Sequence, residues 1–252
     1  MSYNICCVPI AALRILPHHT SEMVSQLLFG ECALITDWEK NGWCKIIAKQ
    51  DHYTGWCLQS QLYRISEEDY LSNNSILAAE WINKIEFNGT LMMIPFGSDV
   101  SKVQDYYKNT IQYQGLTWNA EEALRDSATI RNIANFYLNT SYLWGGRSVF
   151  GTDCSGFTQQ VFRFLNITLP RDSHMQAQQG EPVNFLQEGR CGDLAFFDNE
   201  EGKIIHVGIL LSSGEIIHAA GKVRVDMIDN QGLINSDTGI RSQQLRIIKR
   251  YF

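Results

Sequence analysis

The pattern of the chain changes near residue 119, and this change limits its fold more than any other feature. Four short segments before it are rich in Val, Ile, Trp and Tyr and are broken by Gly, Asn and Asp. They cover residues 6–16, 31–39, 42–49 and 53–59. Short strands at such close spacing predict a small all-β barrel over residues 1–62. We expect the intervening residues 21–31 to form a loop or a short helical turn.

The pattern of short strands returns more weakly over residues 63–120, in the segments LAAEWINKIEF and GTLMMIPFG. We interpret this region as a second, degenerate barrel. Residues 121–252 differ, because helical periodicity comes first and strand-like segments follow from Cys191 onward. Helices followed by an antiparallel sheet predict an α+β domain over residues 121–252.

Two helices are expected in this last region. The first lies within residues 119–138, where Glu121 and Glu122 suit the positive end of a helix. The second begins near Cys154 and repeats apolar residues along one face. The predicted buried positions are Leu124, Ala128, Ile130, Ile133, Ala134 and Leu138 in the first helix and Phe157, Val161, Phe164 and Leu165 in the second.

Charge and cysteine content exclude several classes of protein. The net charge is −6 and no basic run occurs, which argues against a nucleic-acid partner. No apolar stretch approaches the roughly 20 residues of a membrane span, and the first residues do not resemble a signal peptide. The seven cysteines form no CxxC motif, so we expect neither a disulfide framework nor a zinc site. A cytoplasmic protein is the simplest expectation.

Cys154 in the sequence GTDCSGF is the candidate nucleophile. A thiol at the first turn of a helix faces unpaired N–H groups and the positive end of the dipole, which lowers its pKa. The glycines around it, Gly145, Gly146 and Gly151, allow a close approach of chain to substrate. The alternative is that Cys154 is one more buried thiol, as we expect for the other six cysteines.

Two histidines favour the catalytic interpretation. His206 and His218 lie in strand-like segments separated by the turn SSGE. A three-residue loop, Ser212 to Gly214, pairs His218 with Gly208 and places both histidines on one face, whereas a two-residue loop separates them. Glycine in the third position is typical of a loop whose last residue is left-handed, so we expect the facing arrangement. A thiol, a base and an orienting group then complete a nucleophilic site.

Asp153 is an unexpected neighbour, since a carboxylate opposes ionisation of the adjacent thiol. One explanation is helix capping by Asp153. The other is that Asp153 binds a cation, such as the free amino group of a substrate.

The motifs YLWGGRSVFGTDCSGF, LPRDSHMQ, GDLAFFD, HVGILL and IIHAAG resemble those of the NlpC-type papain-like cysteine peptidases. The resemblance covers about half of the chain and implies a catalytic triad of Cys154, His206 and His218. It implies a papain-like peptidase domain preceded by two SH3-like barrels, and no metal or organic cofactor.

The front half, in RILPHHTSEMVSQLLFGE and DHYTGW, resembles a subgroup, the γ-D-glutamyl-L-diamino-acid endopeptidases, also called dipeptidyl-peptidase VI. That subgroup cuts cell-wall stem peptides after L-Ala-γ-D-Glu and requires a free N-terminal L-Ala, so a role in peptidoglycan turnover or recycling is implied. The amine is held by an acid and a tyrosine of the first barrel and by the Asp before the nucleophile. The implied substrate-binding residues are Glu22, Tyr53, Trp144, Asp153, Ser155, Asp172 and Ser173.

The implied mechanism begins with proton transfer from Cys154 to His206, which His218 orients. The partner is a small peptide, and a monomer is expected. Plain alternatives remain for individual residues: Glu22 as a solvated acid, Tyr53 as a barrel aromatic, and Asp172 with Ser173 as a helix cap after Pro170. Alternatives for the whole chain are another thiol amidase or acyltransferase, or an inactive module that binds cell-wall peptide.

Overall fold

The computed structural model describes residues 2–72, 76–102 and 111–252. Contacts within the chain define two compact units. The first comprises Met1–Glu122 together with Trp144–Phe150, and the second comprises Ala123–Leu143 together with Gly151–Phe252. Residues 73–75 and 103–110 of the predicted second barrel lie outside the described residues. The division into three domains at residues 62 and 120 stays a prediction.

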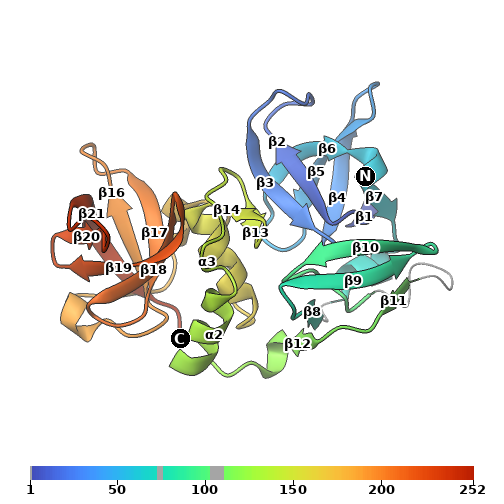
Figure 1. The fold of residues 1–252 in the computed structure, drawn as a ribbon. Helices are drawn as coiled ribbons and strands as arrows, with labels where there is room; N and C mark the ends of the chain where they lie inside the picture. The colour runs from blue at the N-terminus through green and yellow to red at the C-terminus, as the bar shows by residue number, and fades with distance from the viewer. Residues whose placement is uncertain (1, 73–75, 103–110) are drawn as a thin grey trace. The chain divides into compact units, whose positions relative to one another are not determined.

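The first unit contains a seven-stranded antiparallel sheet in the order β3-β2-β6-β5-β4-β1-β7 (Figure 1). Its inward side chains are small or aliphatic and include three thiols, so the core needs no aromatic ring. The strands are β1 (Ser2–Cys6), β2 (Ile10–Arg14), β3 (Met23–Leu28), β4 (Cys32–Trp38), β5 (Trp43–Ala48), β6 (Thr54–Leu58) and β7 (Leu62–Arg64), with the 3₁₀ turn η1 (Gln59–Gln61) before the last.

Strand β3 lies in a segment for which no strand was predicted. Residues 21–31 were expected to form a loop or a helical turn, but Met23–Leu28 pair with β2 along their whole length. Ser25 and Gln26 are buried although they are polar, and they interrupt the apolar pattern that marks a strand. Gln26 has its hydrogen-bond partner in Arg147 of the same unit.

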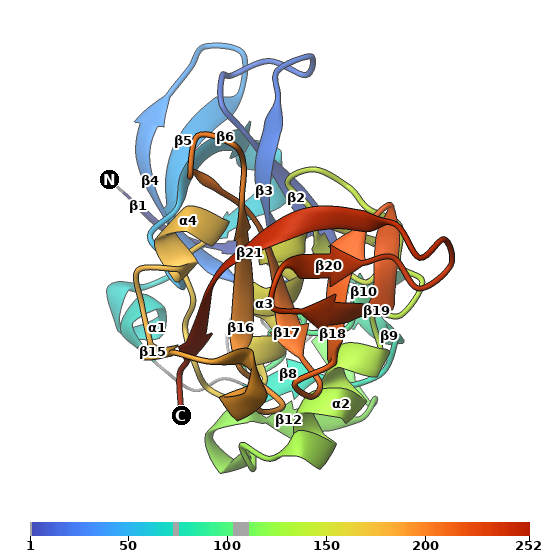
Figure 2. The ribbon, with the colours of Figure 1, turned by 90° about the vertical axis from the view of Figure 1, so that its left-hand side faces the viewer.

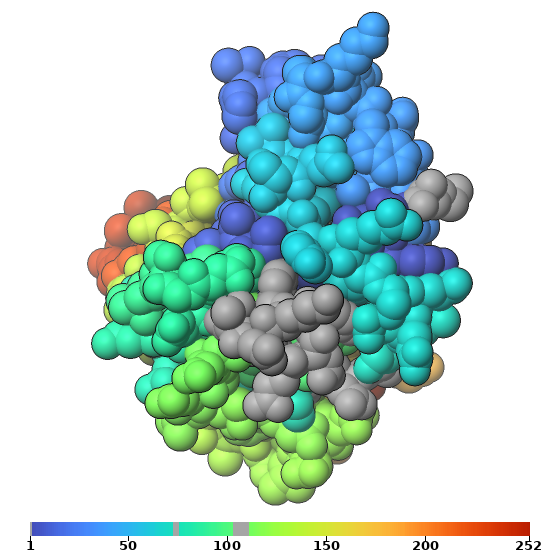
Figure 3. Space-filling view, turned by 90° about the vertical axis from the view of Figure 1, so that its right-hand side faces the viewer, coloured from blue at the N-terminus to red at the C-terminus, as the bar shows by residue number. Residues whose placement is uncertain are grey.

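Shorter elements complete the first unit. Strands β9 (Ile82–Phe87), β10 (Thr90–Pro95) and β11 (Ile111–Tyr113) form one antiparallel sheet, and β8 (Ile76–Ala78) pairs with β12 (Thr117–Asn119). Their core side chains gather around Phe29 of the segment after β3. Figure 3 shows residues of these green strands beside the blue residues of the seven-stranded sheet. The remaining elements are α1 (Glu67–Leu71), η2 (Ala120–Glu122) and β13 (Arg147–Ser148).

The second unit is built on another seven-stranded antiparallel sheet, ordered β15-β21-β16-β17-β18-β19-β20. Because β20 also pairs with β21, six of its strands close into a barrel, whose curvature Figure 2 shows. The strands of this sheet are β15 (Glu181–Val183), β16 (Leu194–Asp198), β17 (Ile204–Leu210), β18 (Glu215–Ala220), β19 (Lys222–Asp229), β20 (Gly232–Ile234) and β21 (Arg241–Arg250). The short strand β14 (Gly151–Thr152) and the turn η3 (Leu186–Glu188) also belong to the second unit.

Helix α3 (Cys154–Arg163) packs against β17 and β18 of this sheet and is buried at every residue (Figure 1). The predicted face of Phe157, Val161, Phe164 and Leu165 is fully buried, as expected. Its neighbours are α2 (Ser127–Asn135) and α4 (Ser173–Gln176).

Helix α2 is shorter than predicted. It begins at Ser127 because the side chain of Asp126 caps it by accepting a hydrogen bond from the Thr129 N–H at 2.8 Å. Three positions predicted to be buried are exposed: Leu124 and Leu138, which lie outside the helix, and Ala128 within it. Within the described part of the chain, no helix is long and apolar enough to cross a membrane.

Candidate active site

Cys154 is the first residue of α3, and the predicted helix start is confirmed. The side chain is 7% exposed. The prediction that its pKa is lowered was wrong, because burial, followed by the charge of Asp153, raises the pKa of Cys154 to about 12. Hydrogen bonds from the backbone N–H groups of Val207 and Ser155 act in the opposite direction but are outweighed. The bond from Val207 places the sulfur against β17, one residue after His206.

The hairpin of β17 and β18 has the predicted register. Gly208 pairs with His218, and the Leu211 N–H donates to the Glu215 carbonyl at 2.8 Å, so the loop is Ser212 to Gly214. The expectation of a left-handed Gly214 was wrong, because its φ angle is not positive. The loop is held instead by the Gly214 N–H donating to Ser212 Oγ at 3.2 Å and by the Gly214 carbonyl accepting from Ile228 N–H.

The two histidines contact each other directly. His206 Nε2 lies 2.8 Å from His218 Nδ1, and the other ring nitrogen of His218, Nε2, lies 3.0 Å from Asp226 Oδ2. All three side chains are buried. Burial lowers the pKa of His206 well below its ordinary value. His206 is therefore a neutral imidazole at neutral pH.

Asp226 on β19 was missed by the sequence predictions. Its Oδ1 accepts from Arg224 Nε at 3.0 Å and from the Ser236 N–H at 2.9 Å. Burial alone would raise the pKa of Asp226, but the hydrogen bonds from His218, Ser236 and Arg224 hold it well below its usual range. A signal was present in the sequence, since the strand KVRVDMI directly after the hairpin carries a carboxylate two residues after Arg224, where strand alternation places both on one face.

Asp153 caps α3, as one of the two explanations predicted: its Oδ1 accepts from the Gly156 N–H at 2.7 Å. Its carboxylate also pairs with Arg171, whose Nη1 lies 3.0 Å from Oδ1 and 2.9 Å from Ser155 Oγ. Both partners of this ion pair are buried. Arg171 was also not predicted, although it lies in the motif LPRDSHMQ.

Two other predicted substrate-binding residues lie beside Arg171 in the sequence. Asp172 is the N-cap residue of α4 and Ser173 is its first residue, so the predicted helix start after Pro170 is present. The Asp172 side chain makes no capping hydrogen bond. Tyr142, which was not predicted, is half-buried, and burial followed by the charges of Cys154 and Asp153 raises its pKa to about 12.

The remaining predicted residues, Glu22, Tyr53 and Trp144, belong to the first unit. Trp144 Nε1 donates to Glu22 Oε1 at 2.7 Å, which brings these two residues together. Both are exposed. Tyr53 is half-buried directly before β6, where its backbone N–H donates to Asp51 Oδ1.

The segment Trp144–Phe150 is fixed in the first unit by a buried arginine. Arg147 donates to both carboxylate oxygens of Glu31, at 2.9 and 3.2 Å, and to the Gln26 carbonyl at 2.6 Å. The Gln26 amide oxygen accepts from the Arg147 N–H at 2.8 Å, which explains the polar residue in β3. Gly145 was expected to allow close approach of substrate, but the residue that approaches it is Met23: a Cβ there would lie 2.5 Å from the Met23 carbonyl oxygen.

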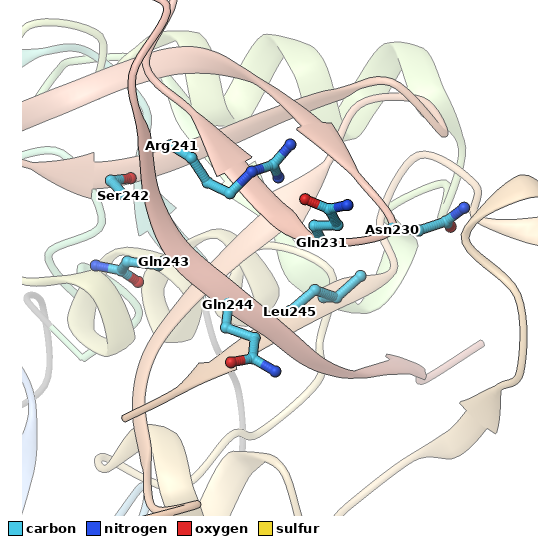
Figure 4. Close-up of a pocket in the computed structure, with 7 residues that line it drawn as sticks. All are labelled: Asn230, Gln231, Arg241, Ser242, Gln243, Gln244 and Leu245. Atoms are coloured by element: carbon cyan, nitrogen blue, oxygen red, sulfur yellow. The ribbon is translucent and has the colours of Figure 1, made fainter. Parts of the chain in front are cut away.

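A separate pocket of about 590 Å³ lies on the second unit, between the turn after β19 and the start of β21 (Figure 4). Its walls are mostly amide, hydroxyl and guanidinium groups, and none of the predicted site residues lines it. The residues are Asn230, Gln231, Arg241, Ser242, Gln243, Gln244 and Leu245. Among the residues that the structure describes, no group of three or more His, Cys, Asp or Glu side chains is arranged to hold a metal ion.

Two family models match the sequence. The model described as the NlpC/P60 family matches residues 139–242, and the model described as the bacterial dipeptidyl-peptidase SH3 domain matches residues 13–62. The first match contains Cys154, His206 and His218, and the second contains Glu22 and Tyr53.

Curated relatives and solved structures agree with these matches. The chain is 30% identical over 217 residues to the γ-D-glutamyl-L-lysine dipeptidyl-peptidase of Bacillus subtilis (strain 168), covering 77% of this chain and 71% of the relative. It is 28% identical over 258 residues to the protein of the same name from Bacillus cereus (strain ATCC 10987), covering 88% of this chain and 76% of the relative.

The fold resembles the crystal structure of an NlpC/P60 family protein from Bacillus cereus ATCC 10987, with a TM-score of 0.80 at 20% identity over 99% of both chains. The predicted fold class, an α+β papain-like domain preceded by an N-terminal SH3-like β domain, is thereby confirmed, and the second SH3-like barrel stays a prediction. The prediction of a cysteine-type peptidase is confirmed as well, and the chain belongs to the NlpC/P60 family.

Proposed function

We propose that this peptidase hydrolyses the bond between γ-D-glutamate and the L-diamino acid of short cell-wall peptides that carry a free N-terminal L-Ala. The observation that carries the proposal is the hydrogen bond between His206 and His218 beside Cys154 at the start of α3. The names of the two Bacillus relatives support the choice of bond and point to lysine as one acceptable diamino acid.

In the proposed reaction, the Cys154 thiol and the His206 imidazole are both neutral before attack. Burial disfavours the thiolate and the imidazolium alike, so the proton moves to His206 as the sulfur attacks the γ-glutamyl carbonyl. Backbone N–H groups at the start of α3, including that of Cys154, stabilise the oxyanion. His206 then protonates the departing amine, and water hydrolyses the thioester.

Recognition of the free amine falls mainly to the first unit in this proposal. Arg171 already balances the charge of Asp153, so that carboxylate attracts a second cation only weakly. Glu22 has no such cationic partner among its described contacts; its Oε1 is oriented by Trp144. We therefore assign the amine to Glu22 and Tyr53, with Asp153 as a secondary contact and Ser155, Asp172 and Ser173 as contacts of the peptide.

A free N-terminal L-Ala occurs only in stem peptides released from muramic acid, so recycling of released peptides is the proposed role. The seven free cysteines support a reducing compartment, and we place the activity in the cytoplasm. The substrate is a small peptide and the protein acts as a monomer.

The deciding experiment compares L-Ala-γ-D-Glu-L-Lys and L-Ala-γ-D-Glu-meso-diaminopimelate, each with a free and with an acetylated N-terminus. We expect release of L-Ala-D-Glu from the free peptides and little from the acetylated ones. Equal cleavage of both forms contradicts the amine site. Binding without any product indicates an inactive binding module, and transfer of the acyl group to an added amine indicates an acyltransferase.

A further inference from the structure

We propose that Asp226 is a positioning residue that selects the tautomers of His218 and His206, so that Nδ1 of His206 is the atom that takes the thiol proton. The inference deepens the proposed function, because it concerns the base of the same site. It rests on a buried chain of contacts from Asp226 through His218 to His206.

The sheet places the three side chains on one face. His218 pairs with Arg224 across β18 and β19, and Asp226 follows Arg224 by two residues, so both lie on the face of His218. On the other side His218 pairs with Gly208, two residues after His206. Strand geometry therefore aligns the base, the orienting histidine and the carboxylate diagonally across three strands.

Asp226 presents a carboxylate that only accepts hydrogen bonds. Its Oδ1 is occupied by Arg224 and by the Ser236 N–H, which keep the group ionised and prevent it from rotating. Oδ2 faces His218 Nε2, so this nitrogen carries a proton. Arg224 balances the charge of Asp226, so the carboxylate orients His218 without requiring an imidazolium.

The tautomer of His218 determines that of His206. A neutral His218 with its proton on Nε2 has a lone pair on Nδ1, and this atom accepts from His206 Nε2. A neutral His206 with its proton on Nε2 then has its lone pair on Nδ1. The thiol proton moves from Sγ to this Nδ1 and later to the leaving amine, while His218 and Asp226 keep their protonation states throughout.

An amide at position 226 removes this selection. The NH₂ group of Asn can donate to His218 Nε2, which stabilises the tautomer with the proton on Nδ1. That proton then points at His206 Nε2 and forces the His206 proton onto Nδ1, where it blocks the base. We therefore expect Asp226→Asn to lower the population of competent enzyme while leaving peptide binding in place.

The test compares Asp226→Asn with the control Asp237→Asn, which removes a different and largely exposed carboxylate that pairs with the same Arg224. We expect Asp226→Asn to lower kcat for the free-amine tripeptide by a factor between about 10 and about 10⁴, the upper figure being typical of an Asp→Asn change directly at the base. KM should change less than threefold, and the control should retain kcat.

A second measurement needs no substrate. In ¹⁵N-histidine-labelled protein, with resonances assigned through His206→Gln and His218→Gln, long-range ¹H–¹⁵N spectra report which ring nitrogen carries the proton. We expect Nε2–H at both histidines in the wild type and in Asp237→Asn, and Nδ1–H at His218 in Asp226→Asn.

A wild-type spectrum with Nδ1–H at His218, or with both of its nitrogens protonated, overturns the proposal even where Asp226→Asn fails to fold. So does an Asp226→Asn variant with unchanged kcat and unchanged tautomers. A wild-type enzyme that does not cleave the peptide contradicts the proposed function instead, and the tautomer measurement still decides the role of Asp226.

Discussion

His206 Nε2 and His218 Nδ1 lie 2.8 Å apart across two neighbouring strands, with their rings nearly perpendicular at 81°. The contact uses the nitrogen of His206 that is remote from the Cα atom. It leaves Nδ1, the nitrogen nearer the backbone, for the thiol.

Cys154→Ala should abolish hydrolysis, because no other group can form the thioester. The substitution removes one buried sulfur atom, and we expect the fold and peptide binding to persist. Mass spectrometry of the released product measures hydrolysis, and isothermal titration calorimetry measures peptide binding. Cys191→Ala is the matched control, since this half-buried thiol lies in the same unit; a variant that retained turnover without Cys154 would identify another nucleophile.

Glu22→Gln should raise KM for the free-amine peptide while changing kcat less. The carboxylate attracts the ammonium group, whereas an isosteric amide carries no charge. We expect a tenfold to hundredfold increase, corresponding to about 1.5–3 kcal/mol for a hydrogen bond to a charged group. Steady-state kinetics with Glu39→Gln, a change at another exposed acid of the first barrel, provides the comparison. Identical KM values in the two variants would remove Glu22 from the amine site.

The thermal stability should fall as the pH is lowered from about 6.5, the ordinary pKa of histidine in an unfolded chain. Burial holds the pKa of folded His206 well below that value, so in this range the unfolded chain binds more protons than the folded one. Folding is therefore progressively disfavoured until the pH reaches the folded pKa. Melting curves between pH 8 and pH 5 measure the slope. His206→Gln should flatten it, and an unchanged slope in this variant would assign the effect to another group.

Gly208→Ala should disturb the site from within the hairpin. An added Cβ would lie 2.7 Å from Ile216 Cδ1 and 2.8 Å from His218 Cβ, closer than packed atoms allow. We expect a loss of about 1–3 kcal/mol in the free energy of unfolding, typical of overpacking, together with a lower kcat. Gly214→Ala, where a Cβ meets nothing within 4 Å, is the control in the same hairpin. If urea denaturation gave the same free energy of unfolding for Gly208→Ala and Gly214→Ala, the packing of His218 would not require glycine at position 208.

Arg147→Met should destabilise the first unit strongly, because it leaves the buried carboxylate of Glu31 without its cation. Breaking one side of a buried pair typically costs about 3–5 kcal/mol. Adding Glu31→Gln should restore part of the loss in a double-mutant cycle. Breaking the exposed pair of Arg241 and Asp229 should cost much less stability, because solvent screens it, and equal losses at both pairs would contradict the difference in burial.

The hairpin register was predictable because strand geometry depends on loop length, and a three-residue loop places His206 and His218 on one face. The prediction succeeded although the conformation of Gly214 was not the expected one. The direction of the Cys154 pKa shift was not predictable in the same way. The effect of a helix start can be inferred from local sequence, whereas burial depends on strands that follow some fifty residues later.

Residues with distant partners were the hardest to predict. Asp226 and Arg171 are charged residues whose roles appear only when β19 and the segment before α4 lie beside the site. Strand β3 was not predicted because Gln26 interrupts its apolar pattern, and the buried partner of Gln26, Arg147, is more than a hundred residues away in the sequence. The available signal for these residues was a charged or amide side chain within an otherwise apolar segment. Such a side chain indicates a buried polar contact, but its partner can be identified only when the fold is known.

Trp144–Phe150 lie in the peptidase half of the sequence, yet they group with the first unit. A cut at residue 122 would therefore not yield two self-sufficient modules. The C-terminal fragment would carry an arginine, Arg147, deprived of its carboxylate, and the N-terminal fragment would keep Glu31 buried without a cation. To keep this ion pair intact, a chimera must take the loop before Cys154 from the same parent as the barrel that holds it.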